Sequence, residues 1–290
     1  MPNKKWKEST IVDGIGTVTI SSWKFFIEYI CKEMLDYEDY IWRGERCTDR
    51  LLEPTLDRLI NNMRTKGKTE SKFREIHLER FKYATRGRRG GNPIPLGDEN
   101  DWWALGQHNG LNTPLLDWTH SPFVAAYFAF ISTGHSQTRY RIIYALHKPS
   151  VEEKSGNIYK YMMTKYNKFN SSRTDDDKKL TIKNLLMGPP YPDRRPIEFI
   201  KPYSDDNQRL INQNGLFTRS PDGVDLEKWI KENMGNNTSN YTLMKILVPN
   251  KDRIECLKSL NRMNINHLTL FPDLYGASAY CNIHGEIKSY

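Results

Sequence analysis

Residues 104–130 read ALGQHNGLNTPLLDWTHSPFVAAYFAF, and this segment is the most informative part of the chain. Its paired leucines, Leu115 and Leu116, predict a short buried strand. Ser121 and Pro122 predict the start of an apolar helix over 123–131, because serine caps helix N-termini and proline fits the first turn. A preceding helix is expected over 101–108, with Asp101 as its cap.

A dense set of polar residues surrounds this apolar strand: Gln107, His108, Asn109, Asn112, Thr113, Asp117, Thr119, His120 and Ser121. Buried polar groups cost free energy unless they bond one another or a ligand. Asp117 is expected at a strand end facing the helix N-terminus, where free N–H groups bind anions. The alternative is a self-contained network, in which Asp117 accepts a hydrogen bond from the amide of Thr119 or Ser121. Gln107 and His108 remain candidate site residues in either case.

Two other segments carry candidate site residues. Trp42-Arg43-Gly44 places an arginine at the end of a strand expected over 40–43. The arginine fork suits a phosphate or carboxylate, and glycine lets the backbone turn or approach a ligand. The alternative is a surface arginine beside an ordinary turn glycine. The segment NQRLINQNGLFT, residues 207–218, places Arg209 and Gln213 on one face of a helix expected over 205–213.

The remaining chain alternates helices and strands without a regular repeat. Helices are expected over 22–35, 51–59, 69–85 and 252–263, and a last one from Pro272. Strands are expected over 140–146, 197–200 and 241–248, and 267–270 is expected to be extended. This order favours an α+β fold over a doubly wound parallel sheet. We expect a single domain over 1–290, with a polar, partly helical insertion at about 150–195.

The net charge of +8 is concentrated in one part of the chain. Ten basic residues and three glutamates lie between residues 61 and 90. This basic helical segment, at about 61–91, predicts a phosphate-rich or acidic partner bound through residues 64–89, with RNA or DNA favoured over a protein. The alternative is a solvated helix face.

Several classes of protein are disfavoured by the sequence. No apolar run approaches the roughly 18–20 residues that span a bilayer, and no apolar segment follows the basic N-terminus as in a signal peptide. The four cysteines lie far apart, and the histidines are not paired at ligand spacings, so we expect neither disulfides nor a metal site. A cytoplasmic protein without a membrane partner is expected.

Taken in order, these segments resemble the FRG domain family, which is named for an aromatic-Arg-Gly strand and has a block close to AQHxGxPTxLLDWTxSPxxAxxFA. The matching parts are WRG at 42–44 and GQHNGLNTPLLDWTHSPFVAAYFAF from 106. The segments at 207–218 and LTLFPDLYGAS at 268–278 are similar to its closing motifs. The chain departs from the pattern at Trp42, at Gly106 and at Asn112-Thr113-Pro114. No arginine follows Thr113, which weakens a phosphate-binding role there.

The order of pieces is also similar to that of the ADP-ribosyltransferase superfamily. This resemblance implies a mixed, mainly antiparallel sheet with surrounding helices and NAD⁺ as the substrate. It implies catalytic roles for Arg43, His108 and Gln213. It implies that NAD⁺ is held by Arg43, Gly44, Gln107, Thr113, Asp117, Thr119 and Ser121. The implied activity is ADP-ribosyl transfer to nucleic acid or protein by a toxin or phage-defence effector, with an antitoxin protein as a partner.

Two other functions stay open. One is a non-catalytic module that senses a nucleotide or binds nucleic acid. The other is a metal-independent nuclease that uses His108 and Asp117. No GxGxxG or P-loop pattern occurs, which disfavours a Rossmann enzyme or a kinase. The transferase hypothesis further predicts that Arg43, Gln107, His108, Asp117 and Gln213 line one cleft.

Overall fold

The computed structural model describes residues 5–65, 72–90, 95–132, 138–170, 195–201, 208–235, 238 and 240–290. The described residues form an α+β fold with one eight-stranded sheet, in the order β1-β2-β8-β5-β3-β4-β7-β6. The strands are β1 (Trp6–Glu8), β2 (Ile15–Ile20), β3 (Tyr40–Glu45), β4 (Leu115–Thr119), β5 (Tyr140–His147), β6 (Glu198–Ile200), β7 (Gly215–Arg219) and β8 (Leu243–Pro249). Only β2 and β8 pair in parallel, so the sheet is mixed and mainly antiparallel.

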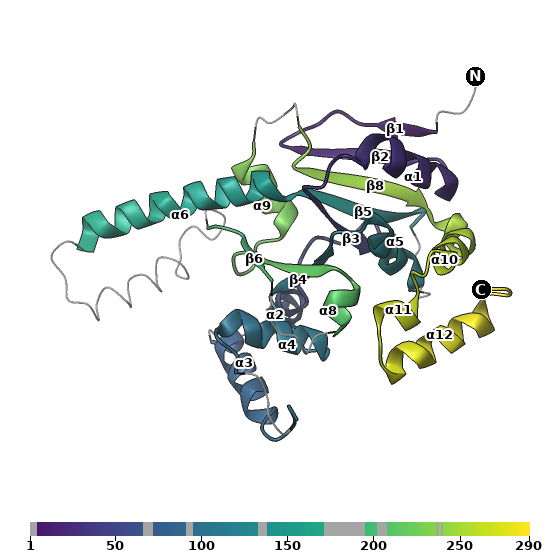
Figure 1. The fold of residues 1–290 in the computed structure, drawn as a ribbon. Coiled ribbons are helices and arrows are strands. Elements are labelled where there is room, and N and C mark those ends of the chain that lie inside the picture. Colours follow the sequence, from purple (N-terminus) through teal and green to yellow (C-terminus); the bar gives the residue numbers. More distant parts are fainter. Residues whose placement is uncertain are drawn as a thin grey trace.

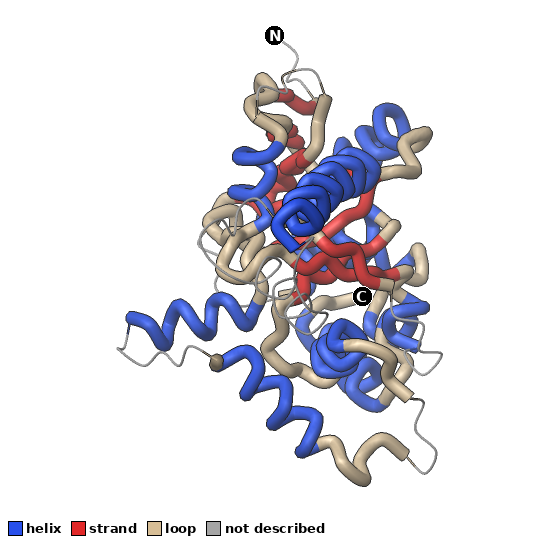
Figure 2. Tube along the Cα trace, turned by 90° about the vertical axis from the view of Figure 1, so that its left-hand side faces the viewer, coloured by secondary structure: helices blue, strands red, loops and turns tan. Residues whose placement is uncertain are grey.

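Helices flank this sheet, and Figure 2 shows the strands in the middle of the molecule. The α-helices of the described residues are α1 (Trp23–Tyr29), α2 (Thr55–Thr65), α3 (Phe73–Ala84), α4 (Glu99–His108), α5 (Pro122–Ile131), α6 (Lys148–Asn170), α8 (Gln208–Asn212), α9 (Leu226–Asn233), α10 (Arg253–Arg262), α11 (His267–Leu270) and α12 (Leu274–Glu286). A π-helical turn, Ile30–Met34, continues α1, and a 3-10 turn, Asn250–Asp252, precedes α10. Figure 1 shows α3 and β1 at opposite ends of the molecule.

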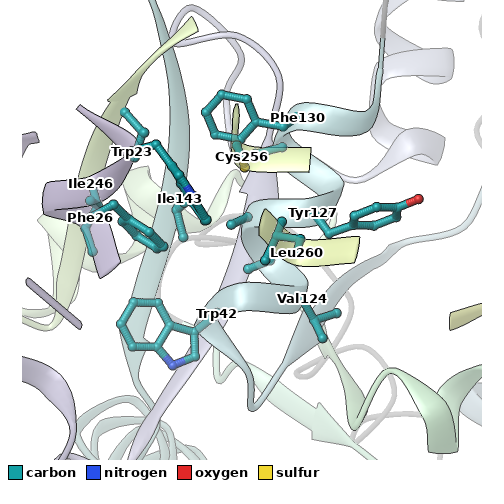
Figure 3. Close-up of a cluster of buried hydrophobic side chains, with 14 of the residues drawn as sticks. Trp23, Phe26, Trp42, Val124, Tyr127, Phe130, Ile143, Ile246, Cys256 and Leu260 are labelled. Atoms are coloured by element: carbon teal, nitrogen blue, oxygen red, sulfur yellow. The ribbon is translucent and has the colours of Figure 1, made fainter. Parts of the chain in front are cut away.

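The central strand β5 is buried on both faces, because successive residues of this strand pack into different hydrophobic cores. Ile143 and Ala145 pack with α1, α5 and α10 in the cluster shown in Figure 3. Ile142 and Tyr144 pack on the other face with α9 and the start of α6. This alternation follows from the two-residue period of a strand. A third core joins α2, α3 and α4 to one end of β4 and β7.

The interface between β3 and β4 is much shorter than its neighbours. Six residue pairs join β3 to β5, and five join β4 to β7. One pair, Trp42 with Thr119, joins β3 to β4. The sheet is therefore nearly divided between these two strands, at the place where the sequence predicted a site.

The expected elements are largely present, with three corrections. The helix expected over 101–108 begins earlier, because Asp98 is its cap and Asp101 is the reciprocal partner in a capping box. The segment 267–270, expected to be extended, is the helix α11, because Asn266 and Thr269 cap it in the same way. The helix expected over 51–59 is shifted to α2, which begins just after Pro54.

The insertion expected at 150–195 begins as the long helix α6, which projects from the body in Figure 1. Residues 171–194 lie outside the described part of the chain.

Gly44 marks the closest approach of the sheet to a helix. A Cβ atom at this position would lie 1.8 Å from the carbonyl oxygen of Ala125 and 2.6 Å from the amide nitrogen of Ala129, both in α5. The obstacle is helix backbone, which cannot rotate away as a side chain can. Gly44 therefore allows β3 to pack directly on α5; it lies within the strand and provides no turn, one of the two roles that the sequence suggested.

Replacing Gly44 by alanine should consequently lower the free energy of unfolding by about 1–3 kcal/mol or more, as overpacking of a tight core does. Gly285→Ala is the matched control, because nothing lies within 4 Å of its added Cβ and alanine favours the α12 helix. Urea denaturation of both variants measures the difference in the free energy of unfolding. Equal stability of the two variants would contradict the close-packing role of Gly44.

Candidate functional site

A cavity of ≈ 360 Å³ lies at the divided part of the sheet. Its lining comes from β3, β4, β7, α4, α5, α8 and the turn before α12: Trp42, Arg43, Gly44, Gln107, His108, Asp117, Trp118, Thr119, Ala125, Phe128, Arg209, Leu210, Gln213, Gly215, Leu216, Phe217 and Phe271. This volume is within the usual range for a small-molecule site. The five residues expected to share one cleft all line this cavity.

Arg43 reaches across the divided sheet. Its Nη1 donates to the backbone carbonyl of Asp117 at 2.9 Å and lies 3.5 Å from the Asp117 carboxylate. Its Nη2 lies 3.8 Å from a carboxylate oxygen of Glu45. The Nε atom is buried and has no hydrogen-bond partner. A largely buried arginine with one unused donor and two long ion-pair contacts is poorly satisfied by the protein alone.

Asp117 is held from the opposite side by an amide. Gln107 Nε2 donates to Asp117 Oδ2 at 2.9 Å, and the Thr113 hydroxyl donates to Gln107 Oε1. Asp117 lies in the middle of β4 with a 57% exposed side chain, so its expected place at a strand end facing a helix N-terminus is wrong. The amide of Ser121 bonds the Thr119 hydroxyl instead. Thr113 is buried outside the lining, where it orients Gln107.

Arg209 provides a second cation at the cavity. Its Nε donates to Asp273 at 2.8 Å, and Nη1 donates to the carbonyl of His108 at 3.4 Å. The guanidinium also lies over the rings of Phe271 and Tyr275, at 5.3 and 5.7 Å. Arg209 thereby connects α8 to α4 and to the start of α12, and it closes one side of the cavity.

Gln213 is fixed in place by both its side chain and its backbone. Nε2 donates to the carbonyl of Leu270 at 3.2 Å, and the Thr119 hydroxyl donates to the backbone carbonyl of Gln213 at 2.6 Å. With Nε2 engaged, Oε1 is the acceptor that this side chain can offer to a ligand. The structure thus places Gln213 just before β7, as the sequence indicated.

The remaining expected residues have structural contacts. Ser121 caps α5 by accepting from the amide of Val124, and it lies outside the lining.

Sequence reasoning did not select Phe128 and Phe271, which form an edge-to-face pair with ring centroids 6.0 Å apart at the cavity. Phe271 belongs to the closing motif at 268–278, which could have indicated it.

His108 is kept neutral by its surroundings. Burial lowers its pKa below the ordinary value of 6.5, and the positive charge of Arg209 lowers this pKa further. Among the described residues, no group of three or more histidine, cysteine, aspartate or glutamate side chains could hold a metal ion. None of the described helices is both long and apolar enough to cross a membrane.

Arg209→Gln should raise the pKa of His108, because a nearby cation is removed. In the wild type the unfolded chain binds a proton before folded His108 does as pH falls through about 6.5. The free energy of unfolding should therefore decrease below that pH, and less so in the variant. NMR titration of the imidazole measures the shift. His120 is the internal control, because burial and two lysines, not Arg209, lower its pKa. An unchanged His108 pKa would contradict this coupling.

Comparison with known proteins gives one family. The family model of the FRG domain matches residues 38–138. No curated protein and no solved structure matched the chain. The matched span begins two residues before β3 and ends two residues before β5, and it includes Arg43, Gln107, His108 and Asp117. Arg209, Gln213 and Phe271 lie beyond it, so the cavity is completed by later segments. The chain is therefore similar to the FRG domain over residues 38–138, about a third of its length.

Proposed function

We propose that the cavity binds NAD⁺ and that the protein is an NAD⁺-dependent ADP-ribosyltransferase-like enzyme. The observation that carries this proposal is the state of Arg43. Its side chain is 16% exposed at the cavity, its buried Nε has no partner, and its ion-pair contacts are long, at 3.5 and 3.8 Å. A diphosphate oxygen in the cavity would give the exposed part of this guanidinium a shorter charge-assisted hydrogen bond.

The arrangement around Arg43 matches the order of groups in NAD⁺. The diphosphate of NAD⁺ is attached to the ribose that carries nicotinamide. Asp117 lies beside Arg43 and is the carboxylate among the described lining residues. With the diphosphate on Arg43, this carboxylate faces the adjacent ribose. The proposal therefore gives Asp117 the role of stabilising positive charge on that sugar.

The chemistry requires one bond to break and one to form. The bond between ribose and nicotinamide breaks, and nicotinamide leaves with the bonding electron pair. The ribose passes through an oxocarbenium-like state that an acceptor nucleophile attacks, and the acceptor loses a proton. Gln213 Oε1 can accept from a ribose hydroxyl, since its Nε2 is held by Leu270. Neutral His108 can receive the acceptor's proton.

Aromatic rings supply the remaining surface. Phe128 and Phe271 line the cavity, and their faces suit the planar nicotinamide ring. Consumption of NAD⁺ or modification of a macromolecule would suit the toxin or phage-defence role that the resemblance implies.

A second candidate function is a non-catalytic nucleotide-binding module. Gln213 favours it, because an amide orients a ribose hydroxyl but cannot stabilise a cation as a carboxylate does. The nuclease hypothesis also retains its two residues in one cavity, since His108 and Asp117 both line it. Each of these functions predicts a different product.

Three substitutions distinguish the functions. Asp117→Asn should abolish nicotinamide release and leave NAD⁺ affinity within about threefold, because only the charge facing the ribose is lost. Arg43→Ala should weaken NAD⁺ binding about 10- to 100-fold, since a hydrogen bond to a charged group contributes about 1.5–3 kcal/mol. Gln213→Glu should raise NAD⁺ hydrolysis by supplying a second carboxylate. Calorimetry measures NAD⁺ binding, and chromatography measures released nicotinamide.

Arg262→Ala is the matched control for Arg43→Ala, because Arg262 is an exposed arginine at the end of α10. Urea denaturation checks that each variant folds, since Arg43 also bridges two strands. Nucleotide binding without nicotinamide release, in the presence of RNA, DNA and protein acceptors, would replace the enzyme by the binding module. Cleavage of nucleic acid without NAD⁺ would favour the nuclease.

A further inference from the structure

The basic segment is not uniformly exposed. Between Lys72 and Gly90 the described chain has seven basic residues and two glutamates. Arg74 is withdrawn from this surface, because it pairs with Asp57 and Asp222 on the inner side of α3. Lys82 pairs with Glu79 at 2.8 Å. Four basic residues are exposed: Lys72, Arg80, Arg86 and Arg88. Lys66 and Lys68 lie outside the described residues.

Aromatic rings are interleaved with these cations. Tyr83 is 68% exposed, and the Arg86 guanidinium lies 4.5 Å from its ring centroid. Trp102 of α4 has Arg89 at 5.2 Å and Lys82 at 5.9 Å from its ring. We call Tyr83, Arg86, Arg89 and Trp102 the stacking face. An exposed tyrosine beside an arginine offers a flat surface and a positive charge together.

The stacking face is attached firmly to the helix that enters the cavity. His77 of α3 contacts the carbonyl of Asn112 at 3.1 Å and stacks on Trp103 with ring centroids 6.2 Å apart. The same helix, α4, carries Trp102 near its start and His108 at its end. Six residues of helix span about 9 Å. A polymer on the stacking face would therefore lie within a short distance of the cavity.

We propose that this face binds single-stranded nucleic acid, with bases stacking at Tyr83 and Trp102 and phosphates near the exposed arginines. The faces of bases in a duplex are covered by their neighbours, so a duplex fits this surface less well. An acidic protein would be bound by the charges alone and would leave the aromatic rings unused. We further infer, on the basis of the proposed function, that the bound strand is the acceptor of the transferred group. The helix α4 connects the stacking face to the cavity.

The experiment measures fluorescence anisotropy of labelled 12-nucleotide oligo(dT) and oligo(U). A duplex of equal length, heparin and polyglutamate serve as competitors. Tyr83→Ala should weaken single-strand affinity about 5- to 100-fold, the range for losing one stacked base, and Tyr83→Phe should retain it. Heparin binding should be unchanged in both variants, because their charge is unchanged.

Charge is tested separately with two triple variants. Arg80→Gln, Arg86→Gln and Arg88→Gln together should weaken both oligonucleotide and heparin binding and flatten the salt dependence. Lys7→Gln, Arg139→Gln and Lys251→Gln form the matched control, since these three exposed cations surround a different cavity, near β1. This control should bind oligonucleotide nearly as the wild type does.

Each contrary result overturns the inference. The inference fails if the oligonucleotides do not bind at 50 mM salt. It also fails if the two triple variants lose oligonucleotide affinity equally. An unaffected Tyr83→Ala protein that also binds polyglutamate would indicate an acidic protein partner instead. Binding is measured without NAD⁺, whereas nicotinamide release without nucleic acid tests the proposed function alone, so the two failures are distinguishable.

Discussion

A single arginine side chain bridges the weakest junction of the sheet. Strands β3 and β4 pair through Trp42 and Thr119 alone, so the ladder between the two parts of the sheet is nearly absent. Arg43 donates across this gap to the carbonyl of Asp117. The same gap is the cavity, which means that one side chain joins the two parts of the sheet and faces whatever binds between them. Gly44, packed on the backbone of α5, sets the position of β3 and hence of Arg43.

Both arginines at the cavity contact carboxylates of the protein. Arg43 faces Asp117 and Glu45, and Arg209 faces Asp273. The Asp273 carboxylate also caps α12, and its hydrogen bonds to the Gly276 amide and to Arg209 lower its pKa. Asp273 therefore stays charged and keeps Arg209 engaged. Arg43 has longer contacts and a free donor, so it is the cation that an anionic ligand can recruit at lower cost.

Local chemistry explains which parts of the fold the sequence could predict. Ser121-Pro122 and the apolar run after them specify α5 by capping and periodicity alone, and the structure confirms this helix. The prediction that 267–270 is extended was wrong. Leu268 and Leu270 alternate with other residues as in a strand, but a capping box that depends on Asn266 and Thr269 makes the segment helical. The strands β1 and β2 were not anticipated; β1 has three residues at the sheet edge and owes its existence to pairing with β2.

The sequence could predict which residues line the cavity, but not which contacts those residues make. Polar density beside an apolar strand indicated Gln107, His108 and Asp117, yet the single-pair junction of β3 and β4 is a property of tertiary pairing. Thr113 and Gly44 match the family pattern for structural reasons, orientation of Gln107 and contact with α5, that spacing alone cannot reveal. Arg74 was counted as part of a basic surface because its partners, Asp57 and Asp222, are distant in sequence.

The central claim is that NAD⁺ occupies the gap between β3 and β4 with its diphosphate on Arg43. A crystal structure of the Asp117→Asn protein with NAD⁺ tests this most directly, because the account predicts that this variant binds without turnover. The expected result is a diphosphate oxygen within hydrogen-bond distance of the Arg43 guanidinium and the nicotinamide ribose beside residue 117. NAD⁺ bound elsewhere, or a cavity in which Arg43 keeps its present contacts at saturating NAD⁺, would contradict the account.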